Sequence, residues 1–136
     1  MKKLIATVAS LPLALAACGN SAEDAAQDRM EADARASAEA SGEAIAALGL
    51  TERQLLDADL IGANNVELGD VERVERAADG TVDRLLVEIE DSDPDRYVHV
   101  PITGLTTMTR GDDVDVQTTM TAADLAALPE VSLTSQ

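Results

Sequence analysis

The stretch VDRLLVEIE, residues 82–90, decides the fold of this chain. Leu85, Val87 and Ile89 recur every second residue, the period that places apolar side chains on one face of a strand. The opposite face carries Arg84, Leu86, Glu88 and Glu90. Asp79-Gly80, just before the stretch, is a strong hairpin signal. Residues 82–90 therefore predict a half-buried strand that is entered through a hairpin.

Further strands are predicted on both sides of this one. Residues 60–62 form a short apolar run, and a turn follows at residues 63–65. Val98, Val100 and Ile102 alternate with polar residues after an acidic turn at 91–95, and Pro101 favours an edge position or a strand end. Val114 and Val116 repeat the pattern. Short strands at this spacing are typical of a small barrel or sandwich.

Two capping boxes predict short helices around the strands. Thr51 precedes Gln54 by three residues, and Thr121 precedes Asp124 by the same interval. A hydroxyl followed by such a partner satisfies the first amide groups of a helix. We expect one helical turn through Leu55 and Leu56, and a short C-terminal helix that runs through residue 128 and stops at Pro129.

One segment, LGDVERVERA at residues 68–77, fits two structures. Leu68, Val71 and Val74 are spaced by three, which suits a helix face better than a flat strand. The following hairpin signal favours a strand, and a bulge could reconcile strand and spacing. Periodicity alone leaves both structures open.

The N-terminal residues predict export. Lys2 and Lys3 precede an uncharged apolar segment at residues 4–17, which is too short to span a bilayer that needs about 20 residues. We assign residues 1–17 to a signal peptide. Residues 18–50 are rich in Ala, Glu, Asp and Ser and show no sustained apolar face, so we expect a tether that is partly helical or disordered.

Charge restricts the partners. The chain has 10 basic and 26 acidic residues, a net charge of −16. Removal of the signal takes Lys2 and Lys3 with it and leaves a net charge of −18. Such a surface disfavours nucleic acid, whose binding depends on Lys and Arg contacts to phosphate. Tyr97 is the only aromatic residue, and this lowers the expectation of a tight small-molecule pocket.

The order of features resembles the PRC-barrel family. The matching segments are residues 60–62, 68–74, 79–82, 85–87, 98–101 and the closing Met120-Thr121-x-x-x-Leu125-x-x-Leu128-Pro129. The resemblance spans roughly residues 54–131. It implies a small, strongly bent β-barrel with a role in protein interaction or assembly, and it carries no catalytic signature. We therefore expect a mainly β domain at 51–131, followed by a tail at 132–136.

Leu15-Ala16-Ala17-Cys18 resembles the lipobox of bacterial lipoproteins. The resemblance implies that Cys18 receives a lipid and becomes the first residue of the mature chain. Cys18 is the only cysteine, so an intramolecular disulfide is excluded. Its neighbours supply no base or cation that would activate a nucleophile. Gly19, rather than Asp, follows the cysteine and favours the outer over the inner membrane.

Other candidate site residues have simpler interpretations. His99 is the sole histidine, which leaves a zinc site of usual composition without ligands; an enzyme centred on His99 and nearby carboxylates is a minor hypothesis. Asp91, Asp93 and Asp95 begin like a calcium loop, but Arg96 and Ile102 stand at its sixth and twelfth positions, so we expect a solvated turn. The glycines at 62, 69 and 80 lack phosphate-loop spacing and predict turns or bulges.

The sequence thus predicts a non-enzymatic envelope lipoprotein that faces the periplasm. Cys18 would anchor it to the membrane, and the PRC-barrel-like module would bind a protein partner without cofactor or metal. The alternative is an acidic periplasmic protein that binds cations through its charge.

Overall fold

The computed structural model describes residues 21–135. The predicted signal peptide and Cys18 lie outside these residues. The described chain contains, in order, α1 (Ser21–Ser41), β1 (Ile45–Ala47), β2 (Leu50–Thr51), α2 (Glu52–Leu56), β3 (Asp59–Ile61), β4 (Glu67–Arg76), β5 (Val82–Ile89), β6 (Tyr97–Pro101), β7 (Thr106–Arg110), β8 (Asp113–Gln117), α3 (Ala122–Ala126), β9 (Glu130–Val131) and the 3-10 turn η1 (Leu133–Ser135).

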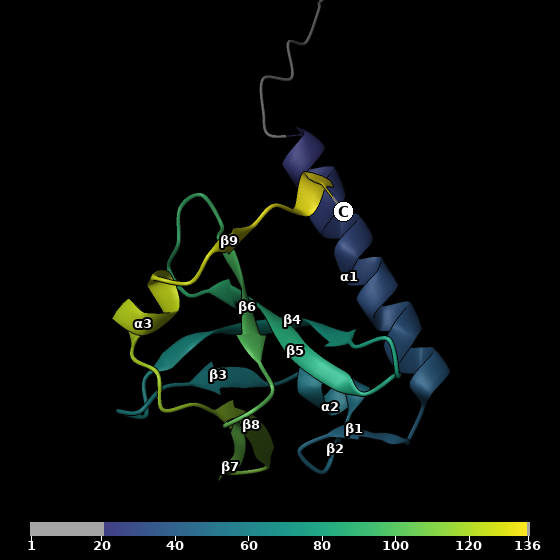
Figure 1. The fold of residues 1–136 in the computed structure, drawn as a ribbon, viewed down its shortest axis with the longest axis vertical. Coiled ribbons are helices and arrows are strands. Elements are labelled where there is room, and N and C mark those ends of the chain that lie inside the picture. Colours follow the sequence, from purple (N-terminus) through teal and green to yellow (C-terminus); the bar gives the residue numbers. More distant parts are fainter. Residues whose placement is uncertain (1–20, 136) are drawn as a thin grey trace, which may run out of the picture.

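Seven strands form one mixed sheet in the order β7-β8-β3-β4-β5-β6-β9, and β1 and β2 form a separate pair (Figure 1). All neighbours in the large sheet are antiparallel except β3 and β8, which run parallel. The prediction of a mainly β domain is confirmed. The predicted barrel closure is not found: within residues 21–135, no strand pairing joins β7 to β9.

The strand β4 is long and irregular, and it resolves the ambiguous segment at 68–77. Its pairing with β3 skips Leu68, and its pairing with β5 skips Glu72. Each skipped residue is an extra residue of the kind found at a β-bulge. These two shifts let Leu68, Val71 and Val74 all become buried despite their spacing by three. The interpretation as a bulged strand is confirmed.

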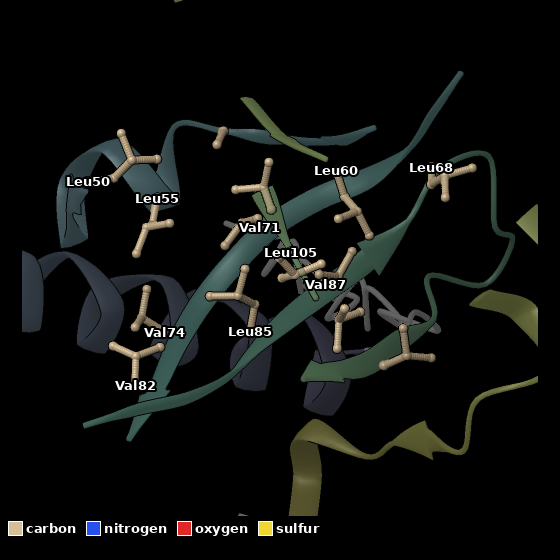
Figure 2. Close-up of a cluster of buried hydrophobic side chains, with 14 of the residues drawn as sticks. Leu50, Leu55, Leu60, Leu68, Val71, Val74, Val82, Leu85, Val87 and Leu105 are labelled. Atoms are coloured by element: carbon tan, nitrogen blue, oxygen red, sulfur yellow. The ribbon is translucent and has the colours of Figure 1, made fainter. Parts of the chain in front are cut away.

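The main core is a cluster of buried aliphatic side chains against the sheet (Figure 2). Leucines and valines fill it, from Leu50 and Leu55 before the sheet to Val116 on β8 and Leu125 on α3. Burial of each such side chain contributes about 1.5–3 kcal/mol. Because α2, α3 and the β1–β2 pair cover this core, it becomes enclosed although the sheet does not close on itself.

Both predicted capping boxes are present. Thr51 Oγ1 accepts the amide of Gln54, whose side chain in turn accepts the amide of Thr51. Thr121 and Asp124 make the same reciprocal pair at the start of α3. This last helix ends at Ala126, two residues before the predicted end. The local sequence therefore predicts both helix starts correctly, while α3 ends earlier than predicted.

The helix α1 packs against the sheet, and the expectation that residues 18–50 lack an apolar face is wrong. Met30, Ala34 and Ala38 are buried at a spacing of four residues. Met30 contacts the cluster of Leu86 and Tyr97 on the sheet face opposite the main core. Alanine side chains are too small to register as an apolar stripe in the sequence, yet they let a helix approach a sheet closely.

A buried carboxylate fastens the C-terminal end of α1. Glu52 of α2 is 1 % exposed. It accepts hydrogen bonds from Ser41 Oγ at 2.8 Å and from Arg76 Nη2 of β4 at 2.9 Å. Burial alone would raise the pKa of Glu52, but hydrogen bonds from Ser37, Arg76 and Ser41 outweigh burial and lower it. Glu52 therefore joins α1, α2 and β4 as a charged group.

The C-terminal residues also belong to the packed unit. The strand β9 pairs with Tyr97 and Val98 of β6. After it, η1 runs beside the N-terminal half of α1, as Figure 1 shows, and Leu133 packs against the Met30 cluster. The packed unit therefore includes residues on both sides of the predicted 51–131 domain.

The close approach of β4 to β5 predicts a strong effect of Gly69→Ala. A Cβ atom at residue 69 would overlap the carbonyl oxygen of Glu88 and lie 2.9 Å from Val87 Cγ1. We expect the free energy of unfolding to fall by about 2–3 kcal/mol, measured by urea denaturation. Gly62→Ala is the control, because its Cβ would meet no atom closer than Leu68 Cδ1 at 2.9 Å and the Met120 carbonyl oxygen at 3.0 Å, so a smaller loss is expected. Equal losses in the two variants would contradict this account.

Candidate functional site

Three carboxylates converge at the β3–β4 hairpin. Asp59, Glu67 and Asp70 each offer an oxygen, and these oxygens lie within 4.8 Å of one another. The charge of Asp59, followed by burial, raises the pKa of Glu67. Burial, followed by the charge of Asp59, raises the pKa of Asp70. Hard oxygen ligands in this arrangement suit a divalent cation such as Ca²⁺.

Arg110 already supplies positive charge to this cluster. Its Nη2 donates to Asp59 Oδ2 at 2.8 Å, and its Nε donates to Asp115 Oδ2. Asp115 is 3 % exposed and also accepts the Asp59 backbone amide at 3.3 Å. The arginine thus joins β7, β8 and β3. Because Asp59 is paired with it, a cation would have to compete with the guanidinium for that carboxylate.

His99 lies within a four-residue polar network on the sheet face opposite the main core. Its Nε2 is 3.1 Å from Oε1 of Glu75, which also accepts Arg73 Nη2 at 2.8 Å, while Glu75 Oε2 accepts Arg84 Nε at 2.6 Å. Burial would raise the pKa of Glu75, but Arg73, Arg84 and His99 together lower it to about 2. A carboxylate this acidic is a weak proton acceptor, so the network fits cross-strand stabilisation better than general base catalysis.

A groove of about 620 Å³ is lined by residues of α1, α2 and β4. Glu72, the residue skipped in the β4–β5 pairing, lines it together with Glu31 and Arg35 of α1. Burial raises the pKa of Glu72 to about 7, with further contributions from the charges of Glu88, Glu31 and Asp70, while Arg35 opposes the shift. The groove therefore contains a carboxyl group that titrates near neutral pH.

The other sequence candidates do not come together as a site. Asp91, Asp93 and Asp95 lie in the β5–β6 connection. Among residues 21–135, Asp59, Glu67 and Asp70 form the one group of three or more metal-ligating side chains within 4.8 Å. The three aspartates are exposed and form no such group, in agreement with the expected solvated turn. Gly80 has a positive φ of 87° at the predicted hairpin turn.

The sequence held a signal for one of the two groups that it did not identify. The spacing of Leu68, Val71 and Val74 by three indicated a bulge, and a bulged residue such as Glu72 is turned out of the regular alternation. Asp59 and Asp70 are direct partners in the β3–β4 register. That pairing requires knowledge of where the hairpin turns and of the irregularity at Leu68, so acidic composition alone did not reveal it.

Comparison with known proteins adds no family assignment. No protein-family model matches the chain, and no curated protein shows significant sequence similarity to it. The resemblance to the PRC-barrel family stays a prediction. In the described part of the chain, no helix combines the length and apolar character needed to cross a membrane.

Proposed function

We propose that this chain is a lipid-anchored protein of the bacterial cell envelope whose folded module binds a protein partner. The lipid on Cys18 would hold it to a membrane facing the periplasm, with the outer membrane favoured over the inner. The bent sheet around one aliphatic core supports the PRC-barrel-like part of this proposal. The proposed role is non-enzymatic and requires no cofactor.

The observation that carries the binding role is the open edge of β7. This strand pairs with β8 along all five residues without a register shift, and it is the terminal strand of the sheet. It contains neither proline nor lysine, two residues that commonly protect such edges. An exposed regular edge can accept a strand from a partner, whose backbone then completes the hydrogen bonds.

The opposite side of the sheet is less suited to strand addition. The two-residue β9 already covers Tyr97 and Val98 of β6. The strand β6 ends in Pro101, which has no backbone N–H to donate. A partner strand therefore finds a longer run of donors and acceptors along β7.

The packing of α1 also determines how an anchored module would present this edge. Cys18 and Ser21 are separated by three peptide units, which span at most about 11 Å. A lipid on Cys18 would therefore keep the first turn of α1 near the bilayer. In Figure 1, α1 begins at one end of the molecule and β7 lies toward the other. The open edge would point away from the membrane.

We predict that proline substitutions on β7 abolish partner capture. Residues 111–112 form a two-residue hairpin loop between paired Arg110 and Asp113. Alternation of the ladder then turns the amides of Thr107 and Thr109 toward the open edge. Thr107→Pro and Thr109→Pro should remove crosslinks to the partner in intact cells, while Thr107→Val, which keeps the amide, should retain them. Capture by the folded proline variants at wild-type levels would exclude this edge.

The anchor is tested separately at Cys18. Mass spectrometry of the mature N-terminus should find a lipid-modified Cys18, and Cys18→Ser should remain unprocessed or leave the membrane fraction. A mature chain that begins elsewhere, with an unmodified cysteine, would refute anchoring while leaving the β7 prediction intact.

The second candidate function is cation binding, which the Asp59–Glu67–Asp70 cluster favours. Calorimetric titration with Ca²⁺ distinguishes it from the leading proposal. Cation binding requires saturable heat at micromolar Ca²⁺ that Glu67→Gln removes. The leading proposal expects weak, unsaturable heat in both proteins, since Arg110 already neutralises part of the cluster.

A further inference from the structure

The two ends of the open β7 edge differ in charge. Residues 103–109, which lead into β7 and form most of it, include no ionisable side chain, and Gln117 of β8 lies opposite Thr106 at the start of β7. At the other end, exposed Asp112 lies in the hairpin loop and exposed Asp113 begins β8. The edge is therefore neutral where β7 begins and acidic where it ends.

Arg110, at the acidic end of β7, is drawn away from the open edge. It donates to Asp115 of β8 and to Asp59 of β3, the two strands that follow β7 on its covered side. Within residues 21–135, the carboxylates of Asp112 and Asp113 have no hydrogen-bond or ion-pair partner. These four carboxylates and one guanidinium leave an excess of three negative charges. The two carboxylates nearest the hairpin tip are therefore uncompensated.

The backbone of this edge favours an added strand that runs antiparallel to β7. The hairpin register turns the amides of Thr107 and Thr109 outward. In an antiparallel addition, each of these residues exchanges two hydrogen bonds with a single residue of the added strand, whereas parallel bonds are slanted and slightly less stable per residue. An antiparallel strand places its N-terminal end beside the hairpin loop, where Asp112 and Asp113 lie.

We infer that the partner strand captured by β7 is basic: it adds antiparallel and carries lysine or arginine at its N-terminal end, beside Asp112 and Asp113. This inference rests on the proposed function, because it names the chemistry of the strand that the same edge would take. The flexible four-carbon stem of a lysine lets its ammonium group reach these carboxylates without disturbing the backbone pairing. A carboxylate in the same place would be repelled.

The local charge asymmetry has to be separated from the general attraction of an acidic chain for any basic peptide. The net charge of −16 acts alike on two peptides of identical composition. Only the asymmetry along β7 distinguishes a peptide with lysines at its N-terminal end from the same residues in reverse order. A pair of such peptides therefore isolates the contribution of the hairpin end.

Three peptides with blocked termini test the inference: Lys-Lys-Thr-Val-Thr-Val-Thr, its reverse Thr-Val-Thr-Val-Thr-Lys-Lys, and Glu-Glu-Thr-Val-Thr-Val-Thr. Each is titrated at low salt into the full chain in a nonionic detergent, and the NMR signals of the Thr107 and Thr109 amides report binding. The peptide with N-terminal lysines should bind about fivefold more tightly than its reverse, because exposed ion pairs contribute modestly. The glutamate peptide should bind most weakly, and added salt should reduce these differences.

The double variant Asp112→Asn, Asp113→Asn should abolish the preference between the two lysine peptides, because it removes the uncompensated carboxylates. The matched control is Asp91→Asn, Asp95→Asn, which removes two exposed carboxylates from the β5–β6 connection and changes the total charge equally. This control should keep the preference.

The outcomes separate this inference from the proposed function. Equal binding of the two lysine peptides, tighter binding of the reverse peptide, or a preference that survives in Asp112→Asn, Asp113→Asn would overturn the inference and leave strand capture by β7 intact. If no peptide shifts the Thr107 and Thr109 amides at millimolar concentration, the edge fails as a docking site and the inference fails with it. None of these results depends on a lipid at Cys18.

Discussion

The irregular pairing of β4 is the constraint on which the rest of the structure depends. This ten-residue strand pairs with β3 on one side and β5 on the other, and α1 and α2 pack against it. Its register shifts at Leu68 and Glu72 bend the sheet around the aliphatic core. Without them, a regular two-residue alternation would place Leu68 and Val71 on opposite faces.

The same irregularity distributes the acidic side chains among different environments. Glu52, Glu72 and Glu75 are identical residues with different protonation behaviour. Glu52 is buried among donors and Glu75 is held by two arginines and His99, so their pKa values are lowered. Glu72 is buried near other carboxylates, and its pKa is raised to about 7. In a chain with few cations, the positions of the arginines decide which carboxylates are stabilised as charged groups.

The arrangement separates possible roles along the molecule. The start of α1 and the turn η1 lie at one end, and the β7 edge lies toward the other (Figure 1). A chain anchored through its N-terminus would therefore use one end for attachment and the other for recognition. The helix α1 lies between them and packs on the face of the sheet that the main core does not occupy. Attachment, spacing and recognition would then depend on different residues.

Much of the local structure was predictable because its signals are local. Alternation at Leu85, Val87 and Ile89 predicted β5, and both capping boxes marked the starts of their helices. The sequence favoured a barrel, yet the sheet stays open, and α2, α3 and the β1–β2 pair cover the core instead. Helical formation at residues 21–41 was foreseen in part, but its docking was not, since alanine gives no strong apolar pattern.

By itself, the sequence determined the strand periodicity, the turns, the helix caps, the strong negative charge and the lipobox-like segment at Cys18, since each depends on residues close together in the chain. Tertiary structure alone decided which carboxylates meet. Asp59 approaches Glu67 and Asp70 because of one hairpin register, and Glu75 meets His99 across β5. Electrostatic environment depends on distance in space, and for these groups that distance is set by register and packing between segments far apart in the chain.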